Sequence, residues 1–204
     1  MARILGITGN IACGKTAVGH MLLDLGIETY LDADALVHRL YLSGQPIAQA
    51  LAETFGDAVM AEDGSVNRPA LGALVFQDPA ALRRLEAIVH PAVGVAMMEA
   101  LAQVSPTGIV VIDAVKLLEG GSGALCQSKW LITCPAEQEM ARLIARNHLS
   151  EAEARARLQA QPSNERRLPL VDEVIDNGGP LEETRRQVEA AFERFCSRFP
   201  AVAL

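Results

Sequence analysis

The chain has little of what a metal-bound or disulfide-stapled protein needs. Only four cysteines occur in 204 residues, none forms a Cys-x-x-Cys pair, and no histidine stands at metal-ligand spacing from one. A zinc site is therefore not expected. A chain of this length buries a sizeable core without disulfides. We predict a cytoplasmic protein in which all four cysteines are reduced thiols: Cys13, Cys126, Cys134 and Cys196.

The sequence also lacks an excess of positive charge. Its 18 Lys and Arg residues against 25 Asp and Glu residues give a formal net charge of −7. Bulk nucleic-acid binding favours a basic surface, so we expect no nucleic-acid partner. The opening MARILGITGN lacks the longer apolar stretch of a signal peptide. No stretch approaches the ~20 apolar residues of a membrane span, so we expect no membrane partner.

Short apolar runs alternate with helical patterns along the chain, which is typical of a parallel α/β fold. Ser150 and Glu153 are spaced as a capping box at the start of one of the helices. The predicted strands cover residues 3–8, 27–31, 108–113, 129–134 and 173–176. The predicted helices around them cover residues 15–25, 136–147, 150–161 and 181–199.

The middle of the chain has a different pattern. Residues 35–104 are predicted to be mostly helical, with no strand of the core type, and Asp63-Gly64 is a hairpin turn signal. We predict a single domain whose core is formed by 1–34 and 105–204. A helical insertion covers about 35–104, and a helical lid covers about 142–161.

A phosphate-binding loop is predicted directly after the first strand. Residues 9–16 fit G-x-x-x-x-G-K-[ST] at every fixed position and lead into a helix. The two glycines permit backbone angles that a Cβ penalises, and the helix adds the positive end of its dipole. We predict ATP as ligand, with Mg²⁺ on the Thr16 hydroxyl. The predicted nucleotide-binding residues here are Gly9, Asn10, Ile11, Ala12, Cys13, Gly14, Lys15, Thr16 and Ala17.

The fold class follows from this loop together with the strand pattern. We predict a P-loop NTPase-type α/β fold, a doubly wound parallel five-stranded sheet with the helical substrate subdomain and the lid added to it. Cys13 has two interpretations. A helix N-terminus and Lys15 lower a thiol pKa, or Cys13 is simply a small residue that fills its place.

Carboxylates follow two of the predicted strands, at the edge where a doubly wound sheet binds its ligand. Asp32 and Asp34 follow the second strand, and Asp113 ends the third. Asp34 is predicted to orient or deprotonate an attacking hydroxyl, and Asp113 to support Mg²⁺. The alternatives are a helix N-cap for the Asp pair and a turn residue for Asp113. No Asn-Lys-x-Asp segment, with which a GTPase reads guanine, occurs in the chain.

Nearly the whole sequence resembles the dephospho-CoA kinase family. ILGITGNIACGKTAV followed by LGIETYLDAD is similar to that family's P-loop, first helix and Asp-Ala-Asp strand end, and DEVIDNG is similar to its last strand and turn. One stretch departs, because Ala114-Val115-Lys116 replaces a proline-containing segment before Leu-Leu. The other positions that carry the resemblance are Asn67-Arg68, Leu71, Val75-Phe76, Leu85-Glu86, His90-Pro91, Arg142, Arg146, Arg157 and Gln161.

The resemblance implies an ATP- and Mg²⁺-dependent phosphotransferase with an alcohol group as acceptor. The expected reaction is phosphorylation of the ribose 3′-hydroxyl of dephospho-CoA in the last step of coenzyme A biosynthesis. The implied catalytic residues are Asp34, Lys15 and Arg146. Arg142 and Asn177 are expected at ATP. The acceptor is expected to contact Asp34, His90, Leu117, Leu118 and Arg157.

Other functions stay open at this point. A kinase of nucleosides or nucleoside monophosphates shares the P-loop, and so does a nucleotide-binding regulatory protein without an acceptor. A kinase-like protein without activity has only the Val115-Lys116 departure in its favour. Any single arginine in the lid can also be a solvated helix residue, and His90 can simply satisfy a hydrogen bond before a proline. The oligomeric state is not predicted.

Overall fold

The computed structural model describes residues 2–119 and 121–201. The chain divides into two compact units. The first combines Met1–Asp32 with Val104–Leu204 and contains the sheet, and the second, Ala33–Gln103, is helical.

The first unit is built on a five-stranded parallel sheet, as the sequence predicted. The strands lie in the order β2-β3-β1-β4-β5, and all neighbouring pairs are parallel. β2 begins two residues later than predicted, because the Ile27 N–H donates back to the carbonyl of Leu22 instead of joining the ladder. The bounds are β1 (Arg3–Thr8), β2 (Thr29–Asp32), β3 (Ile109–Asp113), β4 (Ser128–Thr133) and β5 (Glu173–Asp176).

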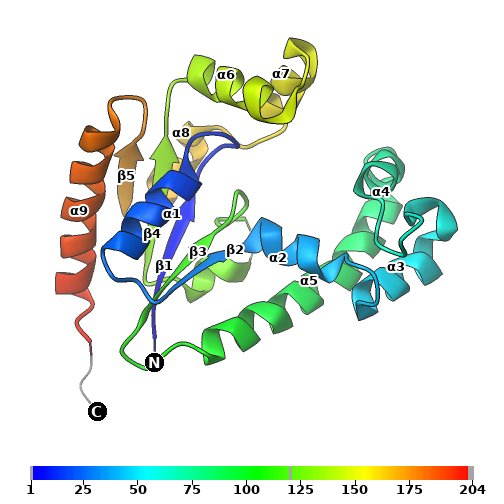
Figure 1. Cartoon of the computed structure of the whole chain (residues 1–204), viewed down its shortest axis with the longest axis horizontal. Helices are drawn as coiled ribbons and strands as arrows, with labels where there is room; N and C mark the ends of the chain where they lie inside the picture. Colours follow the sequence, from blue (N-terminus) through cyan, green and yellow to red (C-terminus); the bar gives the residue numbers. More distant parts are fainter. Residues whose placement is uncertain (1, 120, 202–204) are drawn as a thin grey trace. The chain divides into compact units, whose positions relative to one another are not determined.

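Two helices, α1 (Lys15–Asp24) and α9 (Leu181–Arg198), lie side by side against the sheet (Figure 1). Their apolar faces meet the central strands in one buried cluster, and burial of such side chains is the main term that stabilises the unit. The cluster includes Leu5, Ile7, Val18, Leu22, Trp130, Ile132, Val188, Phe192 and Phe195. β1, which leads into the predicted phosphate loop, thus lies at the centre of the packed core.

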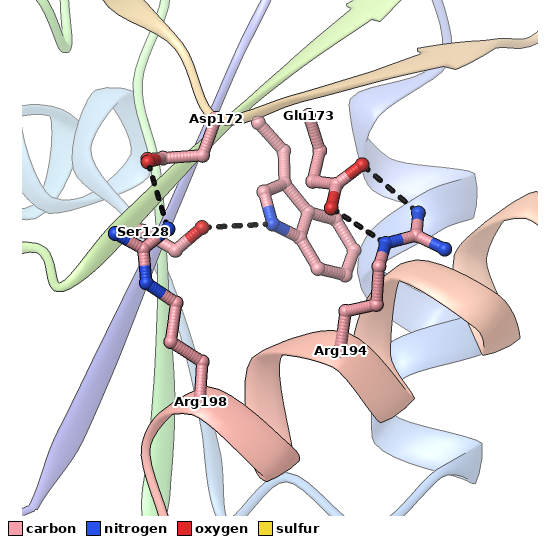
Figure 2. Close-up of polar contacts among 6 residues, drawn as sticks. Ser128, Asp172, Glu173, Arg194 and Arg198 are labelled. Carbon is pink, nitrogen blue, oxygen red and sulfur yellow. Dashed lines mark hydrogen bonds and ion pairs between the residues drawn. The ribbon is translucent and has the colours of Figure 1, made fainter.

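Polar contacts tie α9 to the amino ends of β4 and β5 (Figure 2). Arg194 donates to both carboxylate oxygens of Glu173, at 2.8 and 2.9 Å. The indole N–H of the fully buried Trp130 donates to the Ser128 hydroxyl at 3.2 Å, which satisfies its only polar group. A groove of about 150 Å³ lies among these residues. It is at the opposite end of the strands from the predicted phosphate loop.

Three further helices of this unit follow β4: α6 (Ala136–Asn147), α7 (Glu151–Gln159) and α8 (Asn164–Arg167). The predicted capping box is confirmed, since the Ser150 hydroxyl accepts from the Glu153 N–H and the Glu153 carboxylate accepts from the Ser150 N–H. α7 ends before the predicted residue 161. Gln161 therefore lies outside the helix. The short 3₁₀ helices are η2 (Gly121–Leu125) and η3 (Leu168–Leu170).

The helical unit has its own apolar core. It contains α2 (Ala33–Leu40), α3 (Pro46–Phe55), η1 (Asp57–Val59), α4 (Arg68–Val75) and α5 (Pro79–Ala102). The side chains of Asn67 and Asp78 accept hydrogen bonds from the first turns of α4 and α5, which gives both helices a defined start. The predicted turn at Asp63-Gly64 is confirmed by an antiparallel bridge between Met60 and Val66.

α5 corrects one expectation. Among the described residues it is the single helix that is long and apolar enough to cross a membrane, with a mean hydropathy of 1.4 over its best window. Pro91 lies inside it, and 11% of that window is buried. One such helix is a weak indication, since long core helices of water-soluble proteins share its length and composition. The absence of a membrane partner therefore stays a prediction.

Candidate active site

The loop between β1 and α1 has the backbone of a phosphate cradle. Gly9, Ala12 and Gly14 have φ values of 149°, 65° and 105°. A Cβ on Gly14 would lie 1.9 Å from the side-chain nitrogen of Asn177, and one on Gly9 would lie 2.3 Å from the carbonyl oxygen of Ile132. Both glycines are thus required by conformation and by space, as the motif predicted.

α1 begins at Lys15 without a side-chain cap, because its N-cap is Gly14. The N–H groups of the first turn and the positive end of the helix dipole therefore meet the loop, which favours an anion there. The Lys15 ammonium donates to the carbonyls of Gly9 and Asn10, at 3.1 Å each. The lysine side chain consequently follows the inner course of the loop.

Two of the predicted nucleotide-binding residues meet at the far side of this loop. The Asn177 side chain donates to the Cys13 carbonyl at 2.9 Å, and its own oxygen accepts from Thr184 at 3.1 Å. Arg142 of α6 donates to the same Cys13 carbonyl at 3.4 Å and to the Asn177 carbonyl at 3.3 Å. The Cys13 carbonyl oxygen therefore joins the loop after β1 to the turn after β5 and to α6.

The Cys13 thiol is fully buried under the loop. Burial raises its pKa to about 11, and the nearby charge of Lys15 only partly opposes that rise. Of the two interpretations of this residue, the structure favours the small side chain that fills its place over an activated thiolate. All four cysteines are free, as predicted.

The two predicted Mg²⁺ residues are linked through a tyrosine that the sequence analysis missed. The Tyr30 hydroxyl donates to the Asp113 carboxylate at 2.5 Å and is also hydrogen-bonded to the Thr16 side chain. Burial, and then the charge of Asp113, raise the pKa of Tyr30 above its ordinary value. A Cβ on Gly19 would lie 2.2 Å from the Tyr30 ring, so the absence of a side chain on α1 makes this approach possible.

A hydroxyl and a carboxylate at this edge are oxygen donors of the kind that Mg²⁺ takes while it keeps several waters. Asp32 and Asp113 are paired residues of the neighbouring strands β2 and β3, so the carboxyl ends of these strands lie next to each other at this edge of the sheet. Among the described residues, no group of three or more His, Cys, Asp or Glu side chains is arranged so that it could hold a metal ion by itself. Thr16 and Asp113 are therefore the residues here that would fit Mg²⁺.

The remaining predicted residues are less closely tied to the loop. Arg146 is exposed and bonds its neighbour Asn147 at 3.0 Å, and Arg157 is also exposed. Leu117 is fully buried against Gly6, whereas Leu118 is partly exposed.

The last two predicted residues belong to the helical unit. Asp34 is the second residue of α2, and His90 precedes the proline inside α5. Both are exposed.

Three residues that were not selected from the sequence contact the loop directly. The Glu139 carboxylate and the Arg167 guanidinium both hold the Asn10 side chain. The Gln161 side chain accepts from the Ile11 N–H at 2.8 Å. Gln161 was noted only as part of the lid pattern. No local signal separates the other two from surface charges, because their burial depends on contacts 129 and 157 residues away in the chain.

Known proteins match this arrangement. A family model described as dephospho-CoA kinase matches residues 3–183, which extends from the start of β1 into the first turn of α9. The chain belongs to the dephospho-CoA kinase family. The dephospho-CoA kinase of Symbiobacterium thermophilum is 44% identical over 196 residues, which are 95% of this chain and 82% of that protein.

Solved structures share the fold of this chain. TT1252 from Thermus thermophilus is 35% identical with a TM-score of 0.82, over 95% of this chain and 97% of that one. A dephospho-CoA kinase from Campylobacter jejuni, at 23% identity, shares the fold with a TM-score of 0.60 over 95% of this chain and 97% of that one. As a member of the dephospho-CoA kinase family, this chain is a kinase that phosphorylates dephospho-CoA to coenzyme A, the last step of coenzyme A biosynthesis.

Proposed function

We propose that the chain transfers the γ-phosphoryl group of ATP to the ribose 3′-hydroxyl of dephospho-CoA. The observation that carries this proposal is the shape of the loop. Its Cys13 carbonyl is tied back by Asn177 and Arg142, and the uncapped start of α1 and Lys15 face the inside of the loop. Such a cradle of N–H groups and one ammonium is what the β- and γ-phosphates of a nucleotide require.

Thr16 and Asp113 are the residues proposed to hold Mg²⁺. The shared hydrogen-bonding partner Tyr30 supports this, because it keeps both oxygens at the same edge of the sheet. A bound Mg²⁺ neutralises charge on the transferring phosphoryl group.

Asp34 is proposed as the base for the acceptor hydroxyl. β2 ends at Asp32, which pairs with Asp113, and Asp34 follows in the first turn of α2. The exposed carboxylate is therefore two residues beyond the strand end that borders the proposed metal site. In that role it accepts the hydrogen bond of the 3′-hydroxyl and takes its proton as the phosphoryl group arrives.

The remaining roles are those that the family resemblance implies. Arg142, Arg146 and Arg157 are proposed to stabilise the phosphates of the two substrates as a lid over about 142–161, with Arg146 at the transferring group. Asn177 is proposed to lie near the adenine of ATP. The helical unit, with His90, and the loop with Leu117 and Leu118 are proposed to bind the acceptor. We further propose that the enzyme acts in the cytoplasm without a nucleic-acid or membrane partner.

Replacement of Asp34 tests the proposed base. Asp34→Asn keeps the size of the side chain and removes its basicity, so ATP affinity should stay within about twofold while kcat falls by about 10²–10⁴-fold. Asp57→Asn, at another exposed aspartate of the helical unit, is the matched control and should behave as the unaltered enzyme. Retention of kcat in Asp34→Asn would remove Asp34 from this role. Phosphorus NMR of the product identifies the 3′ position.

A further inference from the structure

The side chain of Asn10, inside the phosphate loop, lies between two buried charged groups of opposite sign. Its oxygen accepts a hydrogen bond from the Arg167 guanidinium at 2.7 Å, and its nitrogen donates to the Glu139 carboxylate at 3.1 Å. Arg167 is 1% exposed and Glu139 is 3% exposed. Arg167 comes from α8 and Glu139 from α6, so two helices reach the loop through one amide.

The chemistry of the two partners determines which way the amide points. A guanidinium only donates hydrogen bonds and an ionised carboxylate only accepts them, so the Asn10 oxygen must face Arg167 and its nitrogen must face Glu139. An aspartate at this position would place two carboxylates in contact. An alanine would leave both charged groups buried without this partner. The Asn10 side chain thus supplies both the acceptor for Arg167 and the donor for Glu139, and it spans the distance between these two groups.

The residues of this contact also bond to other parts of the proposed phosphate-binding site. The carbonyl of the same Asn10 residue accepts from the Lys15 ammonium. The second arm of Arg167 donates to the carbonyl of Val115 at 3.2 Å, and the Thr8 hydroxyl donates to the same carbonyl at 3.1 Å. One guanidinium therefore fixes both the loop after β1 and the segment after β3.

Stability alone does not account for these groups. Among the described residues, Nε of Arg167 and Oε1 of Glu139 are buried side-chain atoms without a hydrogen-bond partner. Replacement of buried charged groups by apolar side chains of similar volume is often neutral or stabilising. In some proteins such buried charged groups specify one geometry, and the segment that these two groups contact is the loop around Asn10.

We propose that Arg167 and Glu139 are positioning residues that set the ATP-binding shape of the phosphate loop through the side-chain amide of Asn10. This inference rests on the assignment of the loop to ATP, and it does not depend on the identity of the acceptor. Its test is therefore nucleotide binding by the full chain, followed by a separation of KM for ATP from kcat and from KM for dephospho-CoA.

An exchange of the two side chains provides the test. Asn10→Asp alone sets two carboxylates against each other, and its Kd for ATP, measured by calorimetry, should rise by about tenfold or more. Glu139→Gln alone still offers an amide oxygen to Asn10, so its Kd should change by less than about threefold. In the double variant, the carboxylate introduced in the loop accepts from Arg167 and from the amide nitrogen introduced on α6. The double variant should therefore regain at least about fivefold of the lost affinity. In this double-mutant cycle, the changes in Kd for ATP caused by the two single substitutions should be clearly non-additive.

Controls separate positioning from a merely structural role. Glu137→Gln makes the same substitution at an exposed site on the same helix and should leave Kd and KM for ATP unchanged. In the Asn10→Asp variant, KM for ATP should rise while KM for dephospho-CoA stays within about twofold. Recovery of the melting temperature in the double variant without recovery of Kd for ATP would overturn the proposal, and so would additive effects.

Arg167→Lys keeps the test decisive if Asn10→Asp does not fold. Lysine retains the positive charge but cannot bridge Asn10 and Val115 with a planar fork. The Kd for ATP should rise by about tenfold. An unchanged Kd for ATP in folded Arg167→Lys would contradict the proposal. A chain that binds ATP as described here but phosphorylates another acceptor would contradict the proposed reaction alone.

Discussion

The side-chain amide of Asn177 donates a 2.9 Å hydrogen bond to the carbonyl of Cys13, from a position 164 residues further along the chain. Asn177 is 6% exposed, and its backbone N–H donates to the Thr133 carbonyl at 2.7 Å. The same Cys13 residue lies one position before Gly14, where a Cβ would collide with the asparagine. The turn after β5 therefore packs directly against the phosphate loop at Cys13 and Gly14.

Removal of this hydrogen bond should weaken nucleotide binding. In Asn177→Ala, the Cys13 carbonyl loses its buried donor, which costs about 1–3 kcal/mol. We expect Kd for ATP to rise by about tenfold and the free energy of unfolding to fall by a similar amount, as measured by calorimetry and urea titration. Gln77→Ala, at an exposed amide side chain between α4 and α5, serves as control. Unaltered ATP binding in Asn177→Ala would show that the loop keeps its shape without this contact.

The contact between Gly19 and Tyr30 gives a prediction opposite to helix propensity. Alanine is favoured over glycine by about 1 kcal/mol in a helix interior. Gly19→Ala should nevertheless destabilise the protein by about 1–3 kcal/mol, because the added Cβ would lie 2.2 Å from the Tyr30 ring. Gly94→Ala, where nothing lies within 4 Å of the added Cβ, should instead be neutral or stabilising. Urea unfolding checks both, and equal effects at the two sites would contradict the packing described here.

The hydroxyl of Tyr30 can be tested separately from its ring. Tyr30→Phe keeps the packing over Gly19 but removes the donor to the buried Asp113 carboxylate. We expect a loss of about 1–3 kcal/mol in the free energy of unfolding. We also expect a shift in the Mg²⁺ concentration that half-activates the enzyme, measured by titration. A variant with unchanged stability and unchanged Mg²⁺ response would remove Tyr30 from the site.

The burial of Cys13 predicts that its thiol reacts slowly with alkylating reagents. Because its pKa is raised from the usual 9.0 to about 11, about one thiol in a thousand is ionised at pH 8. Iodoacetamide should therefore leave Cys13 unmodified in the native enzyme and label it after denaturation, as mass spectrometry of peptides will show. Rapid native labelling of Cys13 would contradict its burial.

The same pKa shift has a consequence for stability. The folded state holds the Cys13 proton more tightly than the unfolded state does. The contribution of this group is therefore complete below pH 9 and is lost as the pH rises towards about 11. Cys13→Ala should show a shallower loss of stability over that window in urea titrations. An identical pH dependence in the two proteins would argue against the raised pKa.

Most of the sheet unit was predictable from the sequence because the signals for its strands, helices and loop depend on residues that are close together in the chain. The Gly-Lys-Thr motif, the apolar run of β3 and the capping box at Ser150 each depend on residues within a few positions of one another. β2 was placed less well, because Ile27 bonds back to the preceding helix. The length and apolar character of α5 were missed because proline and charges interrupt its pattern.

The site was only partly predictable for a related reason. Asn177 and Arg142 were selected because the resemblance implied them at ATP, and both contact the loop at Cys13. Tyr30, Glu139 and Arg167 were not, because each becomes part of the site through a distant partner. A buried arginine and an exposed one have the same local pattern in a sequence. Burial is a property of the fold, and the fold is what brings these charges to the loop.

The measurement that tests the account most directly is ADP release by the purified protein with ATP and Mg²⁺. It is made without an acceptor and with dephospho-CoA, AMP, CMP or nucleosides in turn. We predict strong stimulation by dephospho-CoA alone, with coenzyme A as the product. Stimulation by a nucleoside or a monophosphate in its place, or no stimulation by any acceptor while ATP still binds, would contradict the account.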